Sequence, residues 1–447
     1  MTDLLDITGD DIALLNDTDL RALIGLLCEA DYRLAGLPTI GIKWGGHQDA
    51  PDEGLDVVVR GEVPPPQNSF IPRKITGFQV KKPDMPGSKI LKEMKPRGIL
   101  REDLQALIQD NGAYIIVSSG GSTAPPALKR RLDAMSEAVA NESNHQNLHL
   151  DFFDRGTIAT WVRNHPSLIL WVRDRIGRQL SGWRPYGNWA NPLGGIDEEY
   201  LLDDGLRLHD GTKRGYERMS VKNGLQSLRS VLSTPGTSIR LIGLSGVGKT
   251  RMVQAMFDER VGKHALNRSQ AFYTNMSDSP APDPKSFAEQ LIALRTRAFL
   301  IVDNCASELH RRLTEACCGQ QSTVSLLTVE YDVREDLPEE TSVYKLEPTS
   351  DEIIEKLIRK RFSNISQVNA RTIADFSRGN ARLAIALANT VGQRETLSGL
   401  KDEQLFERLF WQAHAQDKSL LISGEACSLV YSFEGTVASH NKLNVIL

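Results

Sequence analysis

The segment from Gly243 to Thr250 has the sequence Gly-Leu-Ser-Gly-Val-Gly-Lys-Thr and fits the pattern G-x-x-x-x-G-K-[ST] at every fixed position. In a loop of this kind, glycines let backbone N–H groups turn inward around phosphate oxygens, and the following helix N-terminus adds a favourable field. Lys249 would reach the β- and γ-phosphates of ATP, and Thr250 would bind Mg²⁺. The residues expected to hold the nucleotide are Gly243, Ser245, Gly246, Gly248, Lys249 and Thr250. The alternative is a structural glycine-rich turn.

The residues around this loop predict the elements that such a site needs. Residues 238–242 indicate a buried strand that enters the loop, and residues 251–257 indicate a helix that leaves it. Residues 298–303 predict a second buried strand that ends in Asp303. A carboxylate in this place is typical of the Walker B aspartate, which positions Mg²⁺. The alternative is an aspartate that only caps a turn.

The residue after Asp303 bears on how fast a nucleotide would be hydrolysed. It is Asn304, which cannot accept a proton, whereas many ATPases have an acid there to activate water. Glu330, which follows a predicted strand at 324–329, is one candidate for that task, and a solvated charge is the other interpretation. We therefore expect slow basal turnover and long nucleotide occupancy.

A second set of reactive side chains lies near the N-terminus. Asp56 stands at the entry of a predicted strand at 55–59, and Gln79 and Lys81 lie in a second predicted strand at 76–81. Side chains two residues apart in a strand point to the same side, so Gln79 and Lys81 share a face. Carboxylate and amide oxygens are ligands for Mg²⁺, and the lysine could direct water at a phosphate. A turn aspartate and a solvated lysine are the alternative.

Other polar residues near this set have plainer explanations. His47 and Asp52 lie in a Gly- and Pro-rich loop, whose polarity accounts for them, and His145 and His149 lack acidic or cysteine partners for a metal. A basic run follows the second strand and is either a solvated face or a surface that neutralises phosphates. It consists of Lys89, Lys92, Lys95, Arg97 and Arg101.

The composition limits the class of protein. The chain has 447 residues, is 40% hydrophobic and 25% charged, and carries a formal net charge of −4, so no global field draws it to nucleic acid or membrane. Its five cysteines include no C-x-x-C pair, so we expect no zinc site and a reducing compartment. Neither a signal peptide nor an apolar run long enough to span a bilayer is evident. A cytoplasmic location without a membrane partner is expected.

The alternation of predicted strands and helices divides the chain into units. Residues 10–180 form one α/β domain, 181–220 a connector, and 221–348 a second α/β unit that holds the phosphate-binding loop. Residues 349–430 are mostly helical, with predicted helices at 351–361, 370–376, 381–390 and 402–413. Residues 431–447 are a weakly structured tail.

The second unit resembles the STAND NTPases, which are signal-sensing ATPases related to AAA+ and NACHT/NB-ARC proteins. The resemblance covers about residues 220–430 and depends on the phosphate-binding loop, the strand that ends in Asp303-Asn304-Cys305, and the segment Ser377 to Ala384. It implies a P-loop NTPase core with a helical lid and winged-helix region. In the family the lid contacts the nucleotide through a Gly-x-Pro-like segment, and Gly379-Asn380-Ala381 stands there without the proline.

The first domain resembles PD-(D/E)xK nucleases of the restriction-endonuclease-like fold, in the Mrr-like subset that has glutamine before the x-Lys. The resemblance depends on Asp56, Gln79 and Lys81, and it implies an Mg²⁺-dependent endonuclease for double-stranded DNA. In the family a helix before the first strand often supplies another acidic ligand. Glu29, in Leu26-Leu27-Cys28-Glu29-Ala30, is the best match for that ligand.

A nuclease-like domain joined to a STAND-like ATPase resembles the antiviral STAND proteins of prokaryotes, in particular the Avs group. This similarity implies that a phage protein, or a separate sensor protein, triggers ATP-dependent homo-oligomerisation, after which the nuclease cuts DNA. The group usually carries a long helical-repeat sensor, so the chain is expected to be truncated or to borrow a partner's sensor. The alternatives are a regulatory or scaffold ATPase whose N-terminal domain binds a partner without cutting, and a nuclease-fold domain that binds nucleic acid but is inactive.

Overall fold

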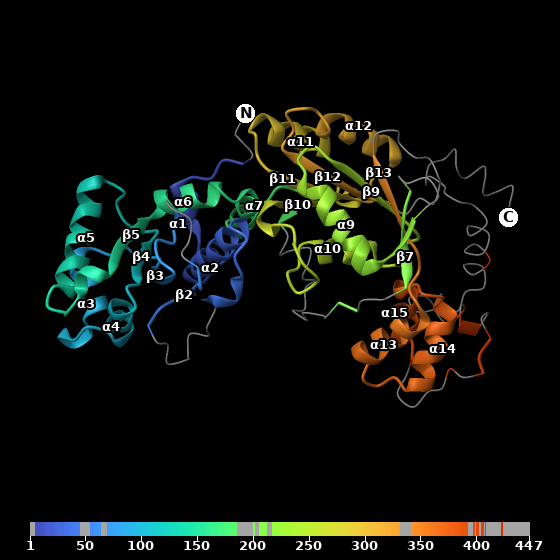
Figure 1. The fold of residues 1–447 in the computed structure, drawn as a ribbon, viewed down its shortest axis with the longest axis horizontal. Helices are drawn as coiled ribbons and strands as arrows, with labels where there is room; N and C mark the ends of the chain where they lie inside the picture. The colour runs from blue at the N-terminus through green and yellow to red at the C-terminus, as the bar shows by residue number, and fades with distance from the viewer. Residues whose placement is uncertain are drawn as a thin grey trace.

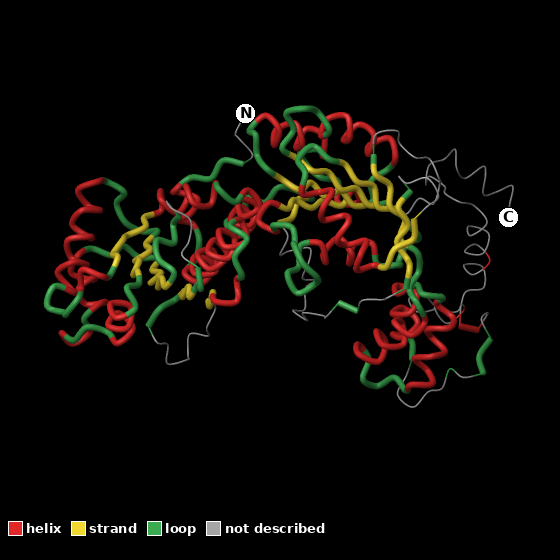
Figure 2. The backbone as a smooth tube through the Cα atoms, viewed as in Figure 1, coloured by secondary structure: helices red, strands yellow, loops and turns green. Residues whose placement is uncertain are grey.

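The computed structural model describes most of the chain, and its described residues are 5–44, 54–63, 69–185, 200–201, 205–211, 217–330 and 341–391, with single positions between 397 and 422. His47, Asp52, most of the predicted helix at 402–413 and the tail at 431–447 lie outside this part. Within it the chain forms three units in a row, with the larger sheet in the middle (Figure 1). Figure 2 shows both sheets with helices packed on them and a third unit made of helices.

The strands and helices alternate along most of the chain, and they include the predicted strands at 76–81, 238–242, 298–303 and 324–329. The strands are β1 Ile42–Trp44, β2 Val57–Arg60, β3 Ile75–Lys81, β4 Ala113–Ser118, β5 His149–Asp154, β6 Trp183–Pro185, β7 Leu206–Asp210, β8 Glu217–Ser220, β9 Ser238–Ile242, β10 Ala271–Asn275, β11 Ala298–Asp303, β12 Val324–Val329 and β13 Ser342–Leu346. The helices are α1 Gly9–Leu14, α2 Asp17–Leu34, α3 Gly87–Met94, α4 Glu102–Gln109, α5 Pro125–Val139, α6 Arg155–Arg163, α7 Pro166–Arg175, α9 Val221–Ser233, α10 Lys249–Met256, α11 Pro284–Ala293, α12 Ser307–Cys317, α13 Asp351–Arg361, α14 Gln367–Ser377 and α15 Ala381–Asn389. Among the helices in the described ranges, none combines the length and the apolar character needed to cross a membrane.

The N-terminal domain is a five-stranded sheet between two helical layers. The strand order is β1-β2-β3-β4-β5, with β1, β2 and β3 antiparallel to their neighbours and β3, β4 and β5 parallel. Successive side chains of β3 point to opposite faces of the sheet. Phe78 and Val80 pack with α1, α2, α6 and α7 on one face. Gln79 and Lys81 point to the opposite face, which α3, α4 and α5 cover.

The second sheet has eight strands in the order β6-β10-β11-β12-β9-β13-β7-β8. Strands β10, β11, β12, β9 and β13 are parallel, and antiparallel strands close the two edges. The edge strands β6, β7 and β8 come from the segment predicted to be a connector, so this segment belongs to the second sheet in its described parts. Helices α9 and α10 cover one face, and α11 and α12 cover the other (Figure 1).

The two sheets share one apolar core. A continuous cluster of buried side chains runs from the N-terminal helices through α7 to α11, α12 and strands β10 to β12. Trp183 of β6 packs within the second domain, where its ring centroid is 4.1 Å from that of Phe287 and its Nε1 donates to the Pro282 carbonyl at 2.9 Å. The buried cluster that includes Trp183 continues into the N-terminal helices, so apolar burial joins the two domains.

The third unit is a small helical lid formed by α13, α14 and α15. Its own core contains Ile354, Ile358, Ile373 and Leu387, all fully buried. The lid follows β13 directly, and β13 pairs with β9, the strand that leads into the phosphate-binding loop. The lid therefore begins close to that loop.

Candidate functional sites

The phosphate-binding loop connects β9 to α10 as the sequence predicts. Gly243, Gly246 and Gly248 have φ angles of 146°, 85° and 102°, which side chains with a Cβ rarely adopt. Lys249 Nζ donates to the carbonyls of Gly243 at 2.7 Å and Leu244 at 2.8 Å, so the ammonium lies against the loop. Burial lowers the pKa of Lys249, and the charge of Arg382 adds to that effect.

Thr250, in the first turn of α10, contacts Asp303 at the end of β11, although β12 lies between β11 and the strand β9 that leads into the loop. Thr250 Oγ1 donates to Asp303 Oδ2 at 2.9 Å, and the hydroxyl of Tyr273 donates to the same oxygen at 3.0 Å. Hydroxyl and carboxylate oxygens in this arrangement fit an Mg²⁺ that keeps several waters. Sequence analysis did not identify Tyr273, which lies in β10, the strand that precedes β11 in the chain.

The carboxylate considered for water activation is engaged elsewhere. Glu330 is buried and forms an ion pair with Arg240. Asn304 has a φ of 53°, and its Nδ2 donates to Asn275 Oδ1 at 2.9 Å. Both side chains therefore stabilise the loops at the sheet edge.

The lid contacts the phosphate-binding loop directly. Asn380 Nδ2 donates to the Ser245 carbonyl at 2.8 Å, the Ala381 N–H donates to the Gly246 carbonyl at 3.0 Å, and Arg382 Nη1 donates to Ser245 Oγ at 3.2 Å. The segment that lacks the family's proline thus lies against the loop itself. Arg382 would face phosphate oxygens bound there.

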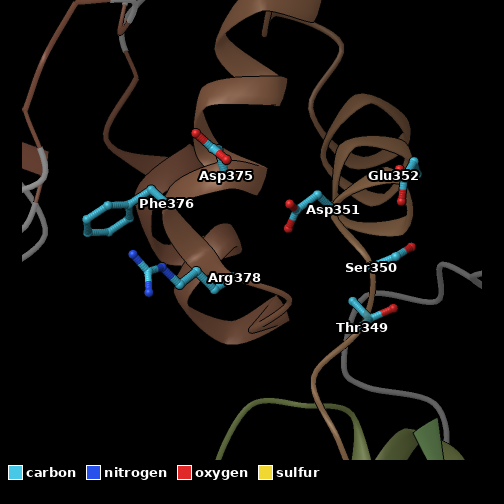
Figure 3. Close-up of a pocket in the computed structure, with 7 residues that line it drawn as sticks. All are labelled: Thr349, Ser350, Asp351, Glu352, Asp375, Phe376 and Arg378. Carbon is cyan, nitrogen blue, oxygen red and sulfur yellow. The ribbon is translucent and has the colours of Figure 1, made fainter. Parts of the chain in front are cut away.

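A polar cavity of about 620 Å³ lies behind this contact, at the start of α13 and the end of α14. Figure 3 shows Asp351 and Asp375 facing each other across it, with Arg378 below. Burial raises the pKa of Asp351, and the negative charges of Asp375 and Glu352 raise it further. The Thr349 N–H donates to the Gly379 carbonyl at 3.1 Å. Thr349 and Arg378 line the cavity, and Asn380 contacts the phosphate-binding loop, so Gly379 lies between the cavity and the lid contact.

The three residues singled out in the N-terminal domain lie close together, with Asp56 directly before β2 and Gln79 and Lys81 on the neighbouring strand β3. Gln79 Nε2 and the Val80 N–H donate to Asp56 Oδ2 at 2.9 and 2.7 Å. Burial raises the pKa of Asp56, and the hydrogen bond from Val80 and the charges of Arg21 and Lys81 oppose that rise. Lys81 Nζ lies 3.3 Å from Glu93 Oε1 on α3.

Two further groups surround these residues. Arg101 Nη1 is 3.0 Å from Glu93 Oε1 and 3.5 Å from Gln79 Oε1. On the other side, Asp17 Oδ1 accepts from the Lys82 N–H at 3.3 Å and forms an ion pair with Arg21. No set of three or more His, Cys, Asp or Glu side chains within the described residues is grouped to hold a metal. Asp17 and Asp56 are nevertheless hard oxygen donors of the kind that Mg²⁺ prefers, whereas the oxygen of the Gln79 amide is directed toward Arg101.

Glu29, the fourth residue predicted for this site, has its contacts elsewhere. Its carboxylate accepts from Trp44 Nε1 at 2.8 Å, from Arg33 at 3.0 Å and from Arg268 at 2.5 Å. Burial alone would raise the pKa of Glu29, but Arg268, Arg33 and Trp44 together hold it below its ordinary value. Arg268 belongs to the second domain, so Glu29 lies at the contact between the domains. Asp17, nearer the start of the same helix, is the acid beside Asp56.

Comparison with known proteins gives fold likenesses of low similarity. No protein-family model matches the chain, and no curated protein sequence matches it. A STAND protein with a tetratricopeptide repeat sensor from Pyrococcus horikoshii is 16% identical over 46% of this chain and 34% of that one, with a TM-score of 0.29. Drosophila ORC bound to DNA is 12% identical over 51% and 65%, with a TM-score of 0.30. The RuvB Holliday junction branch migration motor of Thermotoga maritima is 15% identical over 42% and 68%, with a TM-score of 0.27.

The geometry of the chain itself defines the class of its second domain. A largely parallel sheet carries the phosphate-binding loop after β9 and the carboxylate of Asp303 at the end of β11, and the loop threonine contacts that carboxylate. These features make the second domain a P-loop NTPase core.

Proposed function

We propose that the protein is a nucleotide-gated, Mg²⁺-dependent DNA endonuclease of the STAND type that serves as an antiphage effector. The observation that carries the proposal is the contact between Asp56 and Gln79, with Lys81 on the same strand face, in a domain that shares its core with the P-loop NTPase domain. ATP and Mg²⁺ are the proposed cofactors, and double-stranded DNA is the proposed substrate.

In the N-terminal site, Asp56 and the Gln79 amide, with its oxygen turned toward Asp56, would hold Mg²⁺, which would supply charge neutralisation and an activated water when bound. Lys81 is placed to stabilise charge on a phosphodiester. Glu93 keeps the ammonium of Lys81 near the strand end, since the two groups are 3.3 Å apart. Lys92 and Arg97 are exposed on α3 and the turn after it, and they would meet DNA phosphates beside the site.

In the NTPase domain, Lys249, Thr250, Asp303 and Arg382 would bind ATP and its Mg²⁺. The lid contact with Ser245 supports a switch, because Arg382, which donates to Ser245 Oγ, would gain a phosphate acceptor when ATP enters the loop. The differential affinity of ATP for two lid arrangements would favour an oligomer that a phage protein or separate sensor triggers. Asn304 after Asp303, together with the pairing of Glu330, supports slow basal hydrolysis.

Plasmid cleavage with Mg²⁺ and ATP tests the proposal. We expect Lys81→Ala and Lys249→Ala to abolish cutting, while Lys82→Ala, next to the first of these, leaves it intact. Growth of cells expressing each variant is measured in parallel, because a trigger absent from the purified reaction is present in infected cells. Cutting or toxicity that persists in Lys81→Ala would refute the nuclease assignment.

The second candidate is a regulatory ATPase whose N-terminal domain binds a partner or nucleic acid without cutting it. The observation in its favour is that Arg21 and Arg101 already lie beside Asp56 and Gln79. Wild-type protein that binds DNA but neither cuts it nor slows infected cells would support this candidate.

A further inference from the structure

Helix α2 runs from the Asp56 site to the surface of the NTPase domain. Its first turns carry Asp17 and Arg21, which lie beside Asp56, and its last turns carry Glu29 and Arg33, which contact the NTPase domain. The helix has 18 residues, so it spans about 27 Å at 1.5 Å per residue. A displacement at one end of a rigid helix is carried to the other end.

At the first end, Arg21 lies beside the carboxylate oxygen of Asp56 that β3 does not contact. Asp56 Oδ2 is held by Gln79 and the Val80 N–H, and Arg21 Nε lies 3.2 Å from the other oxygen, Oδ1. A guanidinium and a divalent cation repel each other, so Arg21 beside Oδ1 lowers the affinity of Asp56 for a cation at that oxygen. Arg21 also pairs with Asp17 of the same helix, so its guanidinium keeps a partner when it leaves Asp56.

At the second end, α2 is paired with the segment that follows the P-loop helix. Arg33 forms an ion pair with Glu259, and Thr39 Oγ1 donates to Glu259 Oε2 at 3.0 Å. Glu259 lies three residues beyond the end of α10, the helix that begins with Lys249. Arg268, which precedes β10, donates to Glu29 at 2.5 Å.

We propose that Arg21 is a gating residue of the Asp56 site and that nucleotide binding controls it through α2. In the described arrangement its guanidinium occupies the open side of Asp56 and keeps a divalent cation away. A nucleotide that moves α10 shifts α2 through Glu259 and Arg33, and Arg21 then leaves Asp56 for Asp17. This inference rests on the proposed function, because it concerns the metal site of the same nuclease domain.

Titration of the full chain with Mn²⁺, followed by the electron paramagnetic resonance of the free ion, tests the first half. We expect Arg21→Gln to raise the affinity of the site that depends on Asp56 by about tenfold or more. Arg21→Lys keeps the charge and should bind like wild type. Arg175→Gln is the matched control, since Arg175 pairs with Asp19 of the same helix at 3.6 Å and does not contact Asp56.

A second titration at a fixed concentration of a non-hydrolysable ATP analogue tests the nucleotide link. Binding by Asp56→Asn is subtracted at the same analogue concentration, so the ion held by the nucleotide cancels. We expect the analogue to raise the affinity of wild type, and Glu259→Gln to remove that increase. Glu289→Gln, which changes an exposed ion pair of α11, should keep the increase.

The outcomes separate this inference from the proposed function. Wild type that binds Mn²⁺ at Asp56 as tightly as Arg21→Gln would overturn the gating role and leave the nuclease proposal standing. An analogue effect that is absent in wild type, or unchanged in Glu259→Gln, would overturn the link through α2. Absence of any ion binding that depends on Asp56, in every folded variant, would overturn both proposals.

Discussion

Arg229 offers a direct test of how the P-loop helix is held in place. This α9 side chain is 1% exposed, and its guanidinium donates five hydrogen bonds to backbone carbonyls at the end of α10 and in the following turn. The acceptors are the carbonyls of Ala255 at 2.6 Å, Met256 at 2.9 Å, Asp258 at 3.0 Å, Val261 at 2.6 Å and Lys263 at 2.8 Å. The positive charge also favours the negative end of the helix.

The change Arg229→Met removes all five donors and keeps an apolar stem. Three of the acceptors, on Ala255, Met256 and Val261, are in buried bonds, and an unpaired buried carbonyl costs about 1–3 kcal/mol. Release from the desolvation penalty of the charge offsets part of that cost. We therefore expect the free energy of unfolding to fall by about 3–5 kcal/mol, a large share of the 5–15 kcal/mol typical of a domain.

Urea denaturation of the full chain, followed by circular dichroism, measures the loss. Arg229→Lys retains three donors and should lose about half as much, since an ammonium cannot match the planar fork. Arg260→Ala, at an exposed ion pair with Asp258 in the same turn, is the control and should change little. A stability of Arg229→Met within about 1 kcal/mol of wild type would refute this reasoning.

Three other predictions follow from single groups. Burial and the charge of Arg240 lower the pKa of His310 to about 4, so between pH 4 and about 6.5 the unfolded state binds more protons than the folded state. The free energy of unfolding therefore falls by up to about 1.4 kcal/mol per pH unit as the pH drops through this range. His310→Asn should flatten this slope when the free energy is measured by urea titration at each pH. Tyr273→Phe removes one of the two hydroxyl donors to Asp303 Oδ2 and should weaken Mn²⁺–ATP binding by about 3- to 10-fold in a fluorescent-nucleotide displacement assay, and an unchanged affinity would argue against the positioning role. Asn380→Ala removes the hydrogen bond from the lid to the Ser245 carbonyl and should weaken nucleotide binding, because the loop whose N–H groups hold phosphate loses that support; an unchanged affinity would show that this bond does not order the loop.

Much of the secondary structure could be predicted from local pattern. Strands at 238–242, 298–303 and 324–329 coincide with β9, β11 and β12, since each is a short apolar run bounded by polar residues. The helix at 351–361 coincides with α13, which has acids in its first turn and bases in its last. The short strands β6, β7 and β8 were not predicted, because three to five residues carry too little periodicity to be distinguished from a connector.

The candidate sites divide in the same way. The chemistry of the phosphate-binding loop follows from residues consecutive in the chain, so glycine spacing, Lys249 and Thr250 are evident without a structure. Asp303 could be predicted because a strand end places it, and the contact with Thr250 at 2.9 Å agrees with that role. Tyr273 could not be, because nothing local marks one tyrosine of a strand as a partner of a carboxylate in another.

What the sequence determined by itself is the set of reactive groups on single elements: the loop from Gly243 to Thr250, Asp303, and Asp56 with Gln79 and Lys81. Only the tertiary structure decided which acid of α2 lies near Asp56. Glu29 and Asp17 are on one helix, and the helix sequence offers both. The packing of α2 across the sheet and against the NTPase domain directs Asp17 to the strand end and Glu29 to Arg268, because these contacts join residues far apart in the chain.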